Sequence, residues 1–414
     1  MNEIIASILV MAYYGAGVYI LFYALWFAAQ VFTGIGYRPA LSNSRSFQPQ
    51  PEILVLIPAY MPNKRLLEAL DAIAASDYRG GLKTYVLLQE CDPDLAAKVR
   101  DTAWRCDEHR FSHLPGNPYH HALKYAARRI NSMMQSAEFH GKHIVLLDKD
   151  NVVEPGFFEA IADGIREGYH IVQGKRIPRE ITGAGQTYDA ISEALNDTCF
   201  RAAPSRLGLG CELSGSAFAI EAALFSEAAE QLDGNTPGMD KNLLIQLLLL
   251  QPGLQMLFQP KACMREDKTA RLETLETQRI RWFGAQYVNG LKYFSALLKT
   301  TFRRHEITPV LFGLNLMRPP RSLHVMLSIV FGVAEVSALL WFDFAALPMF
   351  FISALTMTIA GAAFLTNANI NADFKSLIAV FPRIALGNAR SVFHGLLPQN
   401  RAAFIHTNHE EVAQ

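Results

Sequence analysis

Residues 53–57 have the sequence ILVLI, an unbroken apolar run that ends at Pro58. A run with no polar residue to face solvent is typical of a parallel strand that is buried on both faces. Two similar runs follow along the chain, YVLL at 85–88 and IVLL at 144–147. These runs predict three buried strands of one sheet.

Segments with helical periodicity separate the three runs, and we predict helices over 64–75, 95–106 and 122–134. Strands that alternate with helices predict an α/β domain with a mainly parallel sheet. Such sheets bind their ligands beyond the carboxyl ends of the strands. Polar residues follow these strand ends, namely Tyr60, Glu90, Asp92, Asp148 and Asp150.

The composition limits the class of protein. The chain has 414 residues, of which half are hydrophobic, with 38 Lys and Arg against 38 Asp and Glu. This length predicts two or three structural units. The high hydrophobicity excludes a disordered chain, and the balanced charge does not favour a nucleic-acid binder. The five cysteines include no C-x-x-C pair, so we interpret them as reduced thiols.

Three long apolar segments predict helices that cross a membrane. Residues 4–37 contain no acidic or basic residue and exceed the roughly 20 residues that a bilayer core requires. A cleaved signal peptide is the alternative, but the start of the chain has Glu3 and no basic residue. We predict further spans in 322–342 and 344–372, rather than a buried hairpin of a soluble domain. The second segment contains one acidic residue, Glu335.

Basic residues predict the orientation, because positive charge favours the cytoplasmic side of a membrane. Arg38 and Arg45 follow the first segment, and Lys375, Arg383 and Arg390 follow the last. The N-terminus is therefore expected outside, and the region between the spans and the C-terminus inside.

The predicted organisation has five parts. They are a membrane helix (1–37), a cytosolic α/β domain (38–289), interfacial amphipathic helices (290–321), two membrane helices (322–372) and a cytosolic amphipathic tail (373–414). An ordinary amphipathic helix on the protein surface explains the pattern of residues 290–321 as well as a helix in the membrane interface does. The protein is expected to be a multi-pass protein of the cell membrane.

Asp148-Lys149-Asp150 comes directly after the third strand. Two carboxylates at a strand end can meet one hard cation, such as Mg²⁺ or Mn²⁺, which shares oxygen ligands with phosphates. A polar turn between strand and helix is the alternative explanation of this pattern taken alone.

A second cluster, Gln278-Arg279-Ile280-Arg281-Trp282, is expected to open a helix. Arg281 could pair with a diphosphate through its planar guanidinium, and Trp282 could stack on a sugar. A surface arginine beside a core tryptophan is the alternative.

Two shorter features complete the pattern. Residues 214–217 form a loop of small residues that would let the backbone approach a ligand closely. Asp240 stands just before the apolar helix predicted over 243–250, a position where aspartate is more often a helix cap.

In this order, the clusters resemble those of the membrane-bound family 2 glycosyltransferases, which include cellulose, chitin and hyaluronan synthases and ceramide glucosyltransferases. The resemblance covers about residues 52–290. Residues 57–60 resemble the nucleotide loop after the first strand, and 148–150 resemble the Asp-x-Asp metal motif. Asp240 resembles the aspartate of the Thr-Glu-Asp base motif, and 278–282 matches Gln-x-x-Arg-Trp in full.

The resemblance implies a GT-A fold and inverting transfer of a sugar from a nucleotide-sugar donor, most often a UDP-sugar. It implies that Asp240 is the general base and that Asp150, with Asp148, binds Mg²⁺ or Mn²⁺. The last motif would hold the diphosphate and the acceptor through Gln278, Arg281 and Trp282. The nucleotide would be contacted by Ala59, Tyr60, Asp148 and either Glu90 or Asp92.

The chain departs from the family pattern at three places. Met239 replaces the usual glutamate before the base, and residues 89–94 replace the usual Asp-Asp-Gly-Ser. Residues 116–121 replace the usual Gly-Lys loop. Within them, His120 and His121 are expected at the surface or facing phosphate, and a zinc site is a minor alternative.

The acceptor is expected to be a polysaccharide or a lipid-linked molecule. Three spans are few for a self-contained export channel, so partner subunits or a homo-oligomer are equally expected. A catalytically silent relative that acts as a membrane scaffold or nucleotide-sugar sensor is the competing hypothesis, and Met239 favours it. A transporter is disfavoured because the spans contain almost no ionisable residues.

Overall fold

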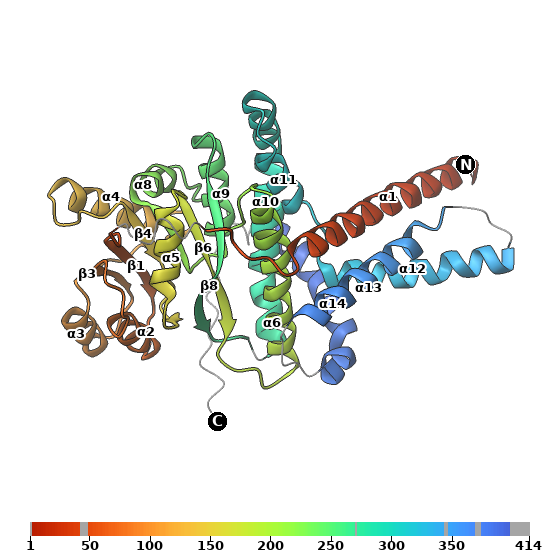
Figure 1. The fold of residues 1–414 in the computed structure, drawn as a ribbon. Helices are drawn as coiled ribbons and strands as arrows, with labels where there is room; N and C mark the ends of the chain where they lie inside the picture. The colour runs from red at the N-terminus through yellow and green to blue at the C-terminus, as the bar shows by residue number, and fades with distance from the viewer. Residues whose placement is uncertain (1, 42–48, 270, 343–346, 369–373, 398–414) are drawn as a thin grey trace.

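The computed structural model describes residues 2–41, 49–269, 271–342, 347–368 and 374–397. An α/β domain lies at one end of the molecule, and long helices that include both α1 and the α12–α13 pair project from the other end (Figure 1). Arg45, which enters the orientation argument, and the part of the predicted tail beyond residue 397 lie outside the described residues.

The sheet has eight strands in the order β3-β2-β1-β4-β7-β6-β8-β5. The strands are β1 (Ile53–Tyr60), β2 (Leu82–Gln89), β3 (Arg105–Glu108), β4 (His143–Leu146), β5 (Val152–Val153), β6 (Ile171–Pro178), β7 (Phe218–Glu221) and β8 (Met256–Glu266). The strands from β3 to β4 in this order are parallel, as is the β6–β8 pair, whereas β7 and β5 run antiparallel to their neighbours. The predicted α/β domain with a mainly parallel sheet is therefore confirmed.

Strand β1 explains why its sequence is apolar throughout. Leu54 and Leu56 pack into one hydrophobic core, and Ile53, Val55 and Ile57 pack into a second core. Successive side chains of a strand point to opposite faces, so a strand between two cores needs an apolar residue at every position. All five residues are fully buried.

The helices of the α/β domain cover both faces of this sheet. They are α2 (Arg65–Ala74), α3 (Pro93–Thr102), α4 (Pro118–Gln135), α5 (Phe157–Arg166), α6 (Ala184–Asn196), the π-helix η2 (Asp197–Ala202), α7 (Ala203–Arg206), α8 (Ala222–Glu230) and α9 (Met239–Leu250). The helix predicted over 95–106 was wrong at its end, because α3 ends at Thr102 and residues 105–108 pair with β2 as an edge strand.

Five helices follow the domain. They are α10 (Leu272–Arg304), α11 (Thr308–Leu316), α12 (Arg321–Phe342), α13 (Met349–Asn367) and α14 (Phe374–Leu396). Helix α14 packs along α10 so closely that a side chain at Gly395 would lie 2.6 Å from the Ile280 carbonyl oxygen. Helix α14 also packs against α12 and α6.

Three helices among the described residues are long and apolar enough to cross a membrane. They are the Ser7–Gly34 part of α1 (Asn2–Gly34), the Arg321–Trp341 part of α12, and α13. Their outer surfaces are apolar, with Leu9, Leu340 and Trp341 each more than 60% exposed. A lipid bilayer would cover such a surface, so these helices are consistent with membrane association.

Glu335 shows why the sequence argument for the second span was incomplete. Its carboxylate accepts hydrogen bonds from the Tyr13 hydroxyl and from the backbone N–H groups of Phe350 (3.2 Å) and Phe351 (2.8 Å). Those N–H groups begin α13 and have no partner within the helix. The acidic residue thus joins three helices, and the segment is not free of charge.

A buried ion network lies between the sheet and α6. Glu193 pairs with Arg176 at 2.9 Å and with Arg201 at 2.8 Å, and all three side chains are at least four-fifths buried. Arg176 also pairs with Glu266 at 3.3 Å, while Arg201 pairs with Asp197. One carboxylate therefore stabilises two guanidinium groups in the interior.

Replacement of Glu193 by glutamine is expected to destabilise the protein by about 3–5 kcal/mol, because it removes the carboxylate shared by two buried guanidinium groups and leaves excess positive charge in the interior. The melting temperature of the detergent-solubilised chain measures the effect. Glu230→Gln is the matched control, because its pair with Arg128 lies on the surface, where such pairs contribute about 0–1 kcal/mol. Equal melting temperatures for the two variants would contradict this account of the network.

Candidate active site

The carboxyl end of β1 is tied to the loop that follows β4. The Lys149 ammonium donates hydrogen bonds to the backbone carbonyls of Tyr60 (2.7 Å) and Met61 (2.8 Å). Tyr60 is half-buried at the strand end, whereas Ala59 is fully buried within β1. Tyr60 can therefore present its side chain at this edge, but Ala59 can contribute only its backbone.

The end of β2 separates the two acidic residues that the sequence left as alternatives. The Asp92 carboxylate accepts hydrogen bonds from the N–H groups of Asp94 (3.0 Å) and Leu95 (3.2 Å), and so caps α3. Glu90 instead lies in the left-handed region, with φ 51°, and accepts a hydrogen bond from Ser112 at 3.3 Å. Asp92 is committed to the helix start, and Glu90 is the carboxylate at the strand end.

Asp148 and Asp150 lie in a turn that Asn151 holds. The Asp148 N–H donates to the Asn151 side-chain oxygen at 2.9 Å, and the Asn151 amide donates to Asp150 Oδ1 at 3.3 Å. Burial, and next the negative charge of Asp150, raise the pKa of Asp148 to about 7. Two carboxylates that repel each other in a half-buried turn would both be stabilised by a shared cation.

Helix α9 carries Asp240 in its first turn, and it meets α10 at close range. Gly238 precedes the helix with φ 75°, and a side chain there would lie 2.2 Å from the Ala285 Cβ of α10. The Asn242 amide also donates to Asn289 Oδ1 at 2.9 Å. Only a glycine permits this approach, which fixes the start of α9 against α10.

Four polar side chains from separate elements act on one another at the candidate site. Burial lowers the pKa of the Arg281 guanidinium on α10, and the negative charges of Asp148 and Asp240 oppose this change. Burial, and next the charge of Asp148, raise the pKa of Tyr119 well above its usual value, while Arg281 opposes the rise. Asp148, Asp240, Arg281 and Tyr119 therefore interact with one another electrostatically.

Tyr119 is a site residue that the sequence reasoning missed. Asn117 caps α4 by accepting the Tyr119 N–H at 3.0 Å, and Pro118 occupies the first turn. The Asn-Pro pair marks a helix start, and recognising it would have brought this tyrosine to the edge of the sheet. The sequence analysis instead began the helix at residue 122.

His120 was wrongly expected at the surface or facing phosphate. It is fully buried, and its Nδ1 lies 2.9 Å from the Asp233 carbonyl oxygen. Burial lowers the pKa of His120 to about 4, so the ring is neutral. His121 lies with Nε2 2.8 Å from the Pro115 carbonyl oxygen. His120 therefore ties α4 to the loop between α8 and α9, and His121 holds the loop before α4.

Gln278 and Trp282 lie one turn apart on α10 and share a face with Arg281. Gln278 is buried and accepts a hydrogen bond from the Thr269 hydroxyl at 2.9 Å. Trp282 is 39% exposed, with its ring 5.5 Å from the Arg279 guanidinium carbon. Gln278 thus secures the segment before α10, and Trp282 presents an aromatic face.

Gln173 of β6 forms hydrogen bonds with the loop of small residues at 214–217. The Gln173 amide donates to Ser214 Oγ at 2.8 Å and to the Ser216 carbonyl at 3.1 Å, while its oxygen accepts the Ser214 N–H at 3.0 Å. Ala217 takes a left-handed backbone conformation, with φ 57°. The loop is therefore fixed rather than adaptable.

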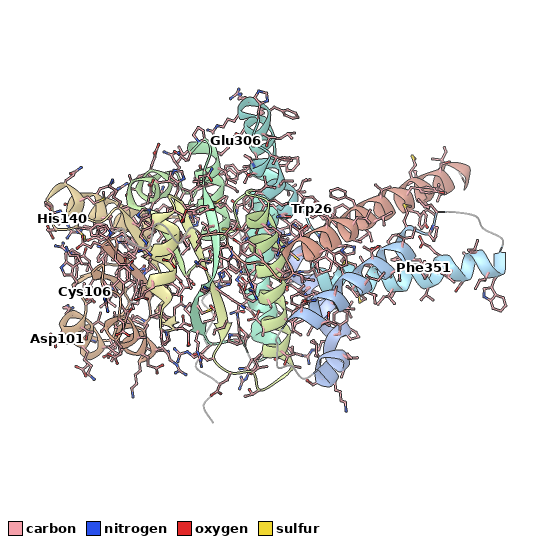
Figure 2. The ribbon with its side chains drawn as sticks, in the orientation of Figure 1. Trp26, Asp101, Cys106, His140, Glu306 and Phe351 are labelled. Carbon is pink, nitrogen blue, oxygen red and sulfur yellow. The ribbon has the colours of Figure 1, made fainter. Side chains whose placement is uncertain are left out.

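A chain of polar contacts leads away from Asp240. Lys241 Nζ lies 3.4 Å from Asp240 Oδ2 and 3.0 Å from Glu212 Oε2. Glu212 Oε1 accepts a hydrogen bond from the Asn315 amide of α11 at 2.9 Å. The Asn315 oxygen accepts in turn from Trp26 Nε1 of α1 at 2.9 Å. Figure 2 shows Trp26 where α1 approaches the α/β domain.

Met239, at the position where the resembling family has glutamate, is 8% exposed and belongs to the hydrophobic core. Asp240, the next residue, is the one whose charge reaches Arg281 and Tyr119. The substitution therefore enlarges the core and leaves the aspartate in the site.

Comparison with known proteins gives a family. The model of the family described as "Glycosyltransferase like family 2" matches residues 49–285. No curated protein matches the chain. The solved structures that it resembles include a mannosyltransferase, PcManGT from Pyrobaculum calidifontis, in complex with GDP-Man and Mn²⁺. That match has 16% identity and a TM-score of 0.47, over 94% of this chain and 99% of that chain.

Another similar structure is S. aureus TarS 1-349 in complex with UDP-GlcNAc. It has 12% identity and a TM-score of 0.40, over 83% of this chain and 89% of that chain. The family model spans more than half of the chain, including β1, the turn with Asp148, the start of α9 and Arg281. The protein therefore belongs to the glycosyltransferase-like family 2, and its α/β domain has the GT-A fold that the sequence predicts.

Proposed function

We propose that the protein is an inverting glycosyltransferase of the cell membrane. It moves a sugar from a nucleotide-sugar donor, with UDP-sugars as the first candidates, to a hydroxyl group of a polysaccharide or lipid-linked acceptor. The observation that carries this proposal is the meeting of Asp148, Asp240, Arg281 and Tyr119 in a family 2 domain. The domain would face the cytoplasm, because Arg38 and the basic residues of α14 flank the apolar helices.

In the proposed reaction the acceptor hydroxyl oxygen attacks the anomeric carbon of the donor sugar. The bond between that carbon and the diphosphate oxygen breaks, and the nucleoside diphosphate leaves with the bonding electron pair. The hydroxyl proton passes to the Asp240 carboxylate. A hydroxyl is a weak nucleophile at neutral pH, so a carboxylate within hydrogen-bond reach is needed.

Arg281 would stabilise the leaving diphosphate through paired N–H donors. Tyr119 keeps its proton at neutral pH, because its pKa is raised well above the usual value by burial and Asp148. Its hydroxyl can therefore donate a hydrogen bond to Asp148 or to a phosphate oxygen. Trp282 would offer its exposed face to the acceptor, and Gln278 would fix the segment before α10.

The carboxylate oxygens of Asp148 and Asp150 suit a divalent cation. Asp150, which raises the pKa of Asp148, shares the turn with it, and Mg²⁺ or Mn²⁺ would relieve this repulsion. The described residues contain no cluster of three or more His, Cys, Asp or Glu side chains that could hold a metal, so diphosphate oxygens would complete the coordination. When bound, such a cation neutralises charge on the leaving diphosphate.

The nucleoside would lie over the ends of β1 and β2. Tyr60 offers an aromatic ring and Glu90 a carboxylate at these neighbouring strand ends, with Asp148 nearer the ribose. Asp92 contributes less than the sequence suggests, because its oxygen caps α3. The silent-scaffold alternative depends on Met239, and the burial of Met239 in the core weakens it.

Nucleotide binding tests the donor half of the proposal. UDP, GDP and CMP would be titrated against the detergent-solubilised chain with Mn²⁺ or with a chelator, and the melting temperature followed. One nucleoside diphosphate should raise it only with the cation, since a ligand that binds the folded state stabilises it. Asp150→Asn should weaken the effect, and Glu230→Gln should not. No stabilisation by any nucleotide would contradict the proposal.

Lys241 is expected to hold the Asp240 carboxylate in position. Lys241→Met should lower kcat by about tenfold, the worth of one charge-assisted hydrogen bond, with the donor KM unchanged. Lys241→Arg should restore most of the loss, because it keeps the charge between Asp240 and Glu212. A Lys241→Met variant with wild-type kcat would show that the contact is incidental.

A further inference from the structure

Three arginine side chains gather on the side of α10 that faces away from Arg281. Arg279 lies two residues before Arg281, which places it about 200° around the helix. Its guanidinium carbon is 4.7 Å from the centre of the Tyr188 ring. The guanidinium carbons of Arg318 and Arg321 lie 3.9 Å and 5.4 Å from the centre of one other ring, Phe200. We call Arg279, Arg318 and Arg321 the arginine cluster.

Tyr188 connects the parts of this cluster. Burial acts to raise the pKa of Tyr188, but the positive charge of Arg279, hydrogen bonds and the charge of Arg321 bring it below its usual value. The Asn388 amide donates both to the Tyr188 hydroxyl at 3.0 Å and to Ser322 Oγ at 2.6 Å, next to Arg321. Arg279 thus lies against Tyr188, which Asn388 joins to Ser322 beside Arg321, while Arg318 and Arg321 lie against Phe200.

Few carboxylates are available to balance this positive charge among the described residues. Asp189 lies 3.6 Å from Arg279, but it also stabilises the charge of the buried Lys268. Glu212 lies 3.9 Å from Arg318, but it already accepts a hydrogen bond from Lys241. Arg321 donates to a neutral partner, the side-chain oxygen of Asn196.

Several N–H groups of the cluster are buried and have no hydrogen-bond partner within the described part of the chain. They are Nε and Nη2 of Arg279, whose side chain is 9% exposed, and Nη1 of Arg321. Buried donors and buried charges are costly when they are left unsatisfied. A guanidinium matches a phosphate through parallel N–H···O bonds. The cluster thus has the chemistry of a site for an anion with several oxygens.

The position of the cluster indicates where such an anion comes from. Phe200 packs with Phe27 of α1 and Met357 of α13 in one hydrophobic cluster. Arg318 and Arg321 lie directly before and at the start of α12, one of the helices able to cross a membrane. Guanidinium groups at this boundary lie where the phosphate of a lipid headgroup would be.

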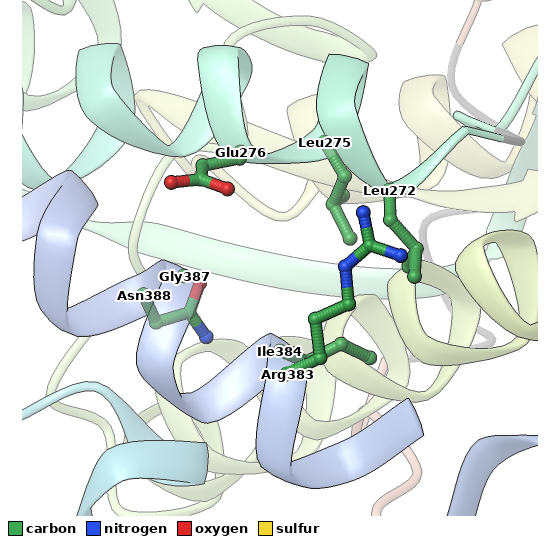
Figure 3. A pocket seen from close by; sticks show the side chains of 7 residues that line it. All are labelled: Leu272, Leu275, Glu276, Arg383, Ile384, Gly387 and Asn388. Carbon is green, nitrogen blue, oxygen red and sulfur yellow. The ribbon is translucent and has the colours of Figure 1, made fainter. Parts of the chain in front are cut away.

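A small groove of about 20 Å³ lies between α10 and α14 (Figure 3), and Leu272, Leu275 and Ile384 give it an apolar lining. Asn388, which bonds to Tyr188 and Ser322, lines one part of it. Arg383 also lines the groove, but it is mostly exposed and pairs with Glu273.

We propose that Arg279, Arg318 and Arg321 bind the phosphate group of a lipid, and that this lipid phosphate anchors the acceptor. The assignment rests on the proposed glycosyltransferase function, whose acceptor it specifies. Glu212 and Lys241 separate Arg318 from Asp240. This separation suits an acceptor whose attacking hydroxyl lies on a sugar attached to the phosphate, rather than on the phosphate itself.

The test uses the full chain in neutral detergent and three probes. Farnesyl phosphate has an apolar chain and a phosphate, farnesol has the same chain alone, and inorganic phosphate has no chain. Wild type should bind farnesyl phosphate at least about tenfold more tightly than either of the other probes, because charged hydrogen bonds are added to apolar contact. Arg321→Gln should lose about tenfold or more in this affinity, and Arg383→Gln should lose none.

UDP binding with Mn²⁺ is measured in parallel and should be unchanged in Arg321→Gln. Failure of UDP, GDP and CMP alike to bind wild type would overturn the proposed function, whereas farnesyl phosphate binding no better than farnesol would overturn only the phosphate site. Equal binding of inorganic phosphate would support the site but overturn its assignment to a lipid. If Arg321→Gln also loses UDP binding, the variants Arg318→Gln and Arg321→Lys are used in its place. Wild-type affinity of Arg318→Gln for farnesyl phosphate would then overturn the proposal.

Discussion

Replacement of Asp240 by asparagine is expected to lower turnover by about 10² to 10⁴, the usual contribution of a general base. The amide has nearly the shape of the carboxylate but cannot take the proton of the acceptor hydroxyl. The affinity for the nucleotide should be kept, because the proposed contacts of the diphosphate come from Asp148, Asp150 and Arg281. A loss of kcat with little change in donor binding is therefore the expected signature.

The measurement is the rate of nucleoside diphosphate release, beside a titration of nucleotide binding. Asp101→Asn is the matched control, because Asp101 is an exposed residue at the edge of the domain far from α1 (Figure 2). Its rate should equal that of wild type. If Asp240→Asn lost nucleotide binding together with turnover, Asp240 would be a structural residue and another base would be required.

Arg281→Gln is the second change with a large expected effect, a loss of about 10² to 10³ in kcat. The guanidinium would stabilise charge on the leaving diphosphate, and it also interacts with the negative charges of Asp148 and Asp240. Its removal takes one positive charge away from these two carboxylates. Donor affinity should therefore fall as well, unlike in Asp240→Asn.

Arg281→Lys should recover only part of the loss, because an ammonium cannot form the paired N–H bonds of a guanidinium. Arg303→Gln, an exposed change near the end of the same helix, is the control and should behave as wild type. Wild-type turnover in Arg281→Gln would exclude this arginine from the site.

The sequence predicts most of the fold because its strongest signals are local. Runs such as 53–57 are apolar at every position, and only a strand between two cores requires that pattern. The carboxyl ends of parallel strands meet at one edge of a sheet, so the polar residues after these runs were expected together. The negative charges of Asp148 and Asp240 also act on Arg281, although the three residues lie far apart in the sequence.

The features that the sequence missed depend on contacts between distant segments. Strand β3 is short and forms because the edge of β2 is available to it. His120 is buried by a loop more than 100 residues away, and Glu335 is satisfied by Tyr13 and by the first turn of α13. The arginine cluster likewise assembles from α10 and from the segment that begins α12. No pattern within one segment of the sequence predicts these contacts between distant segments.

The same reason explains why the path from Asp240 to α1 could not be predicted. Glu212, Asn315 and Trp26 are spread over nearly 300 residues, and each is unremarkable in its own segment. Only the packing of α1 against α11 joins them. Through these contacts the start of α9, which carries Asp240, is linked to a helix that is able to cross the membrane.

The most direct test of the central claim is nucleoside diphosphate release by the full chain in membrane lipids. A panel of sugar nucleotides would be supplied with Mg²⁺, Mn²⁺ or a chelator, beside Asp240→Asn. The account predicts that one donor releases its nucleoside diphosphate only with the divalent cation, and that Asp240→Asn abolishes this release. Tight nucleotide binding with no release from any donor would contradict it, and would make a catalytically silent relative the better explanation.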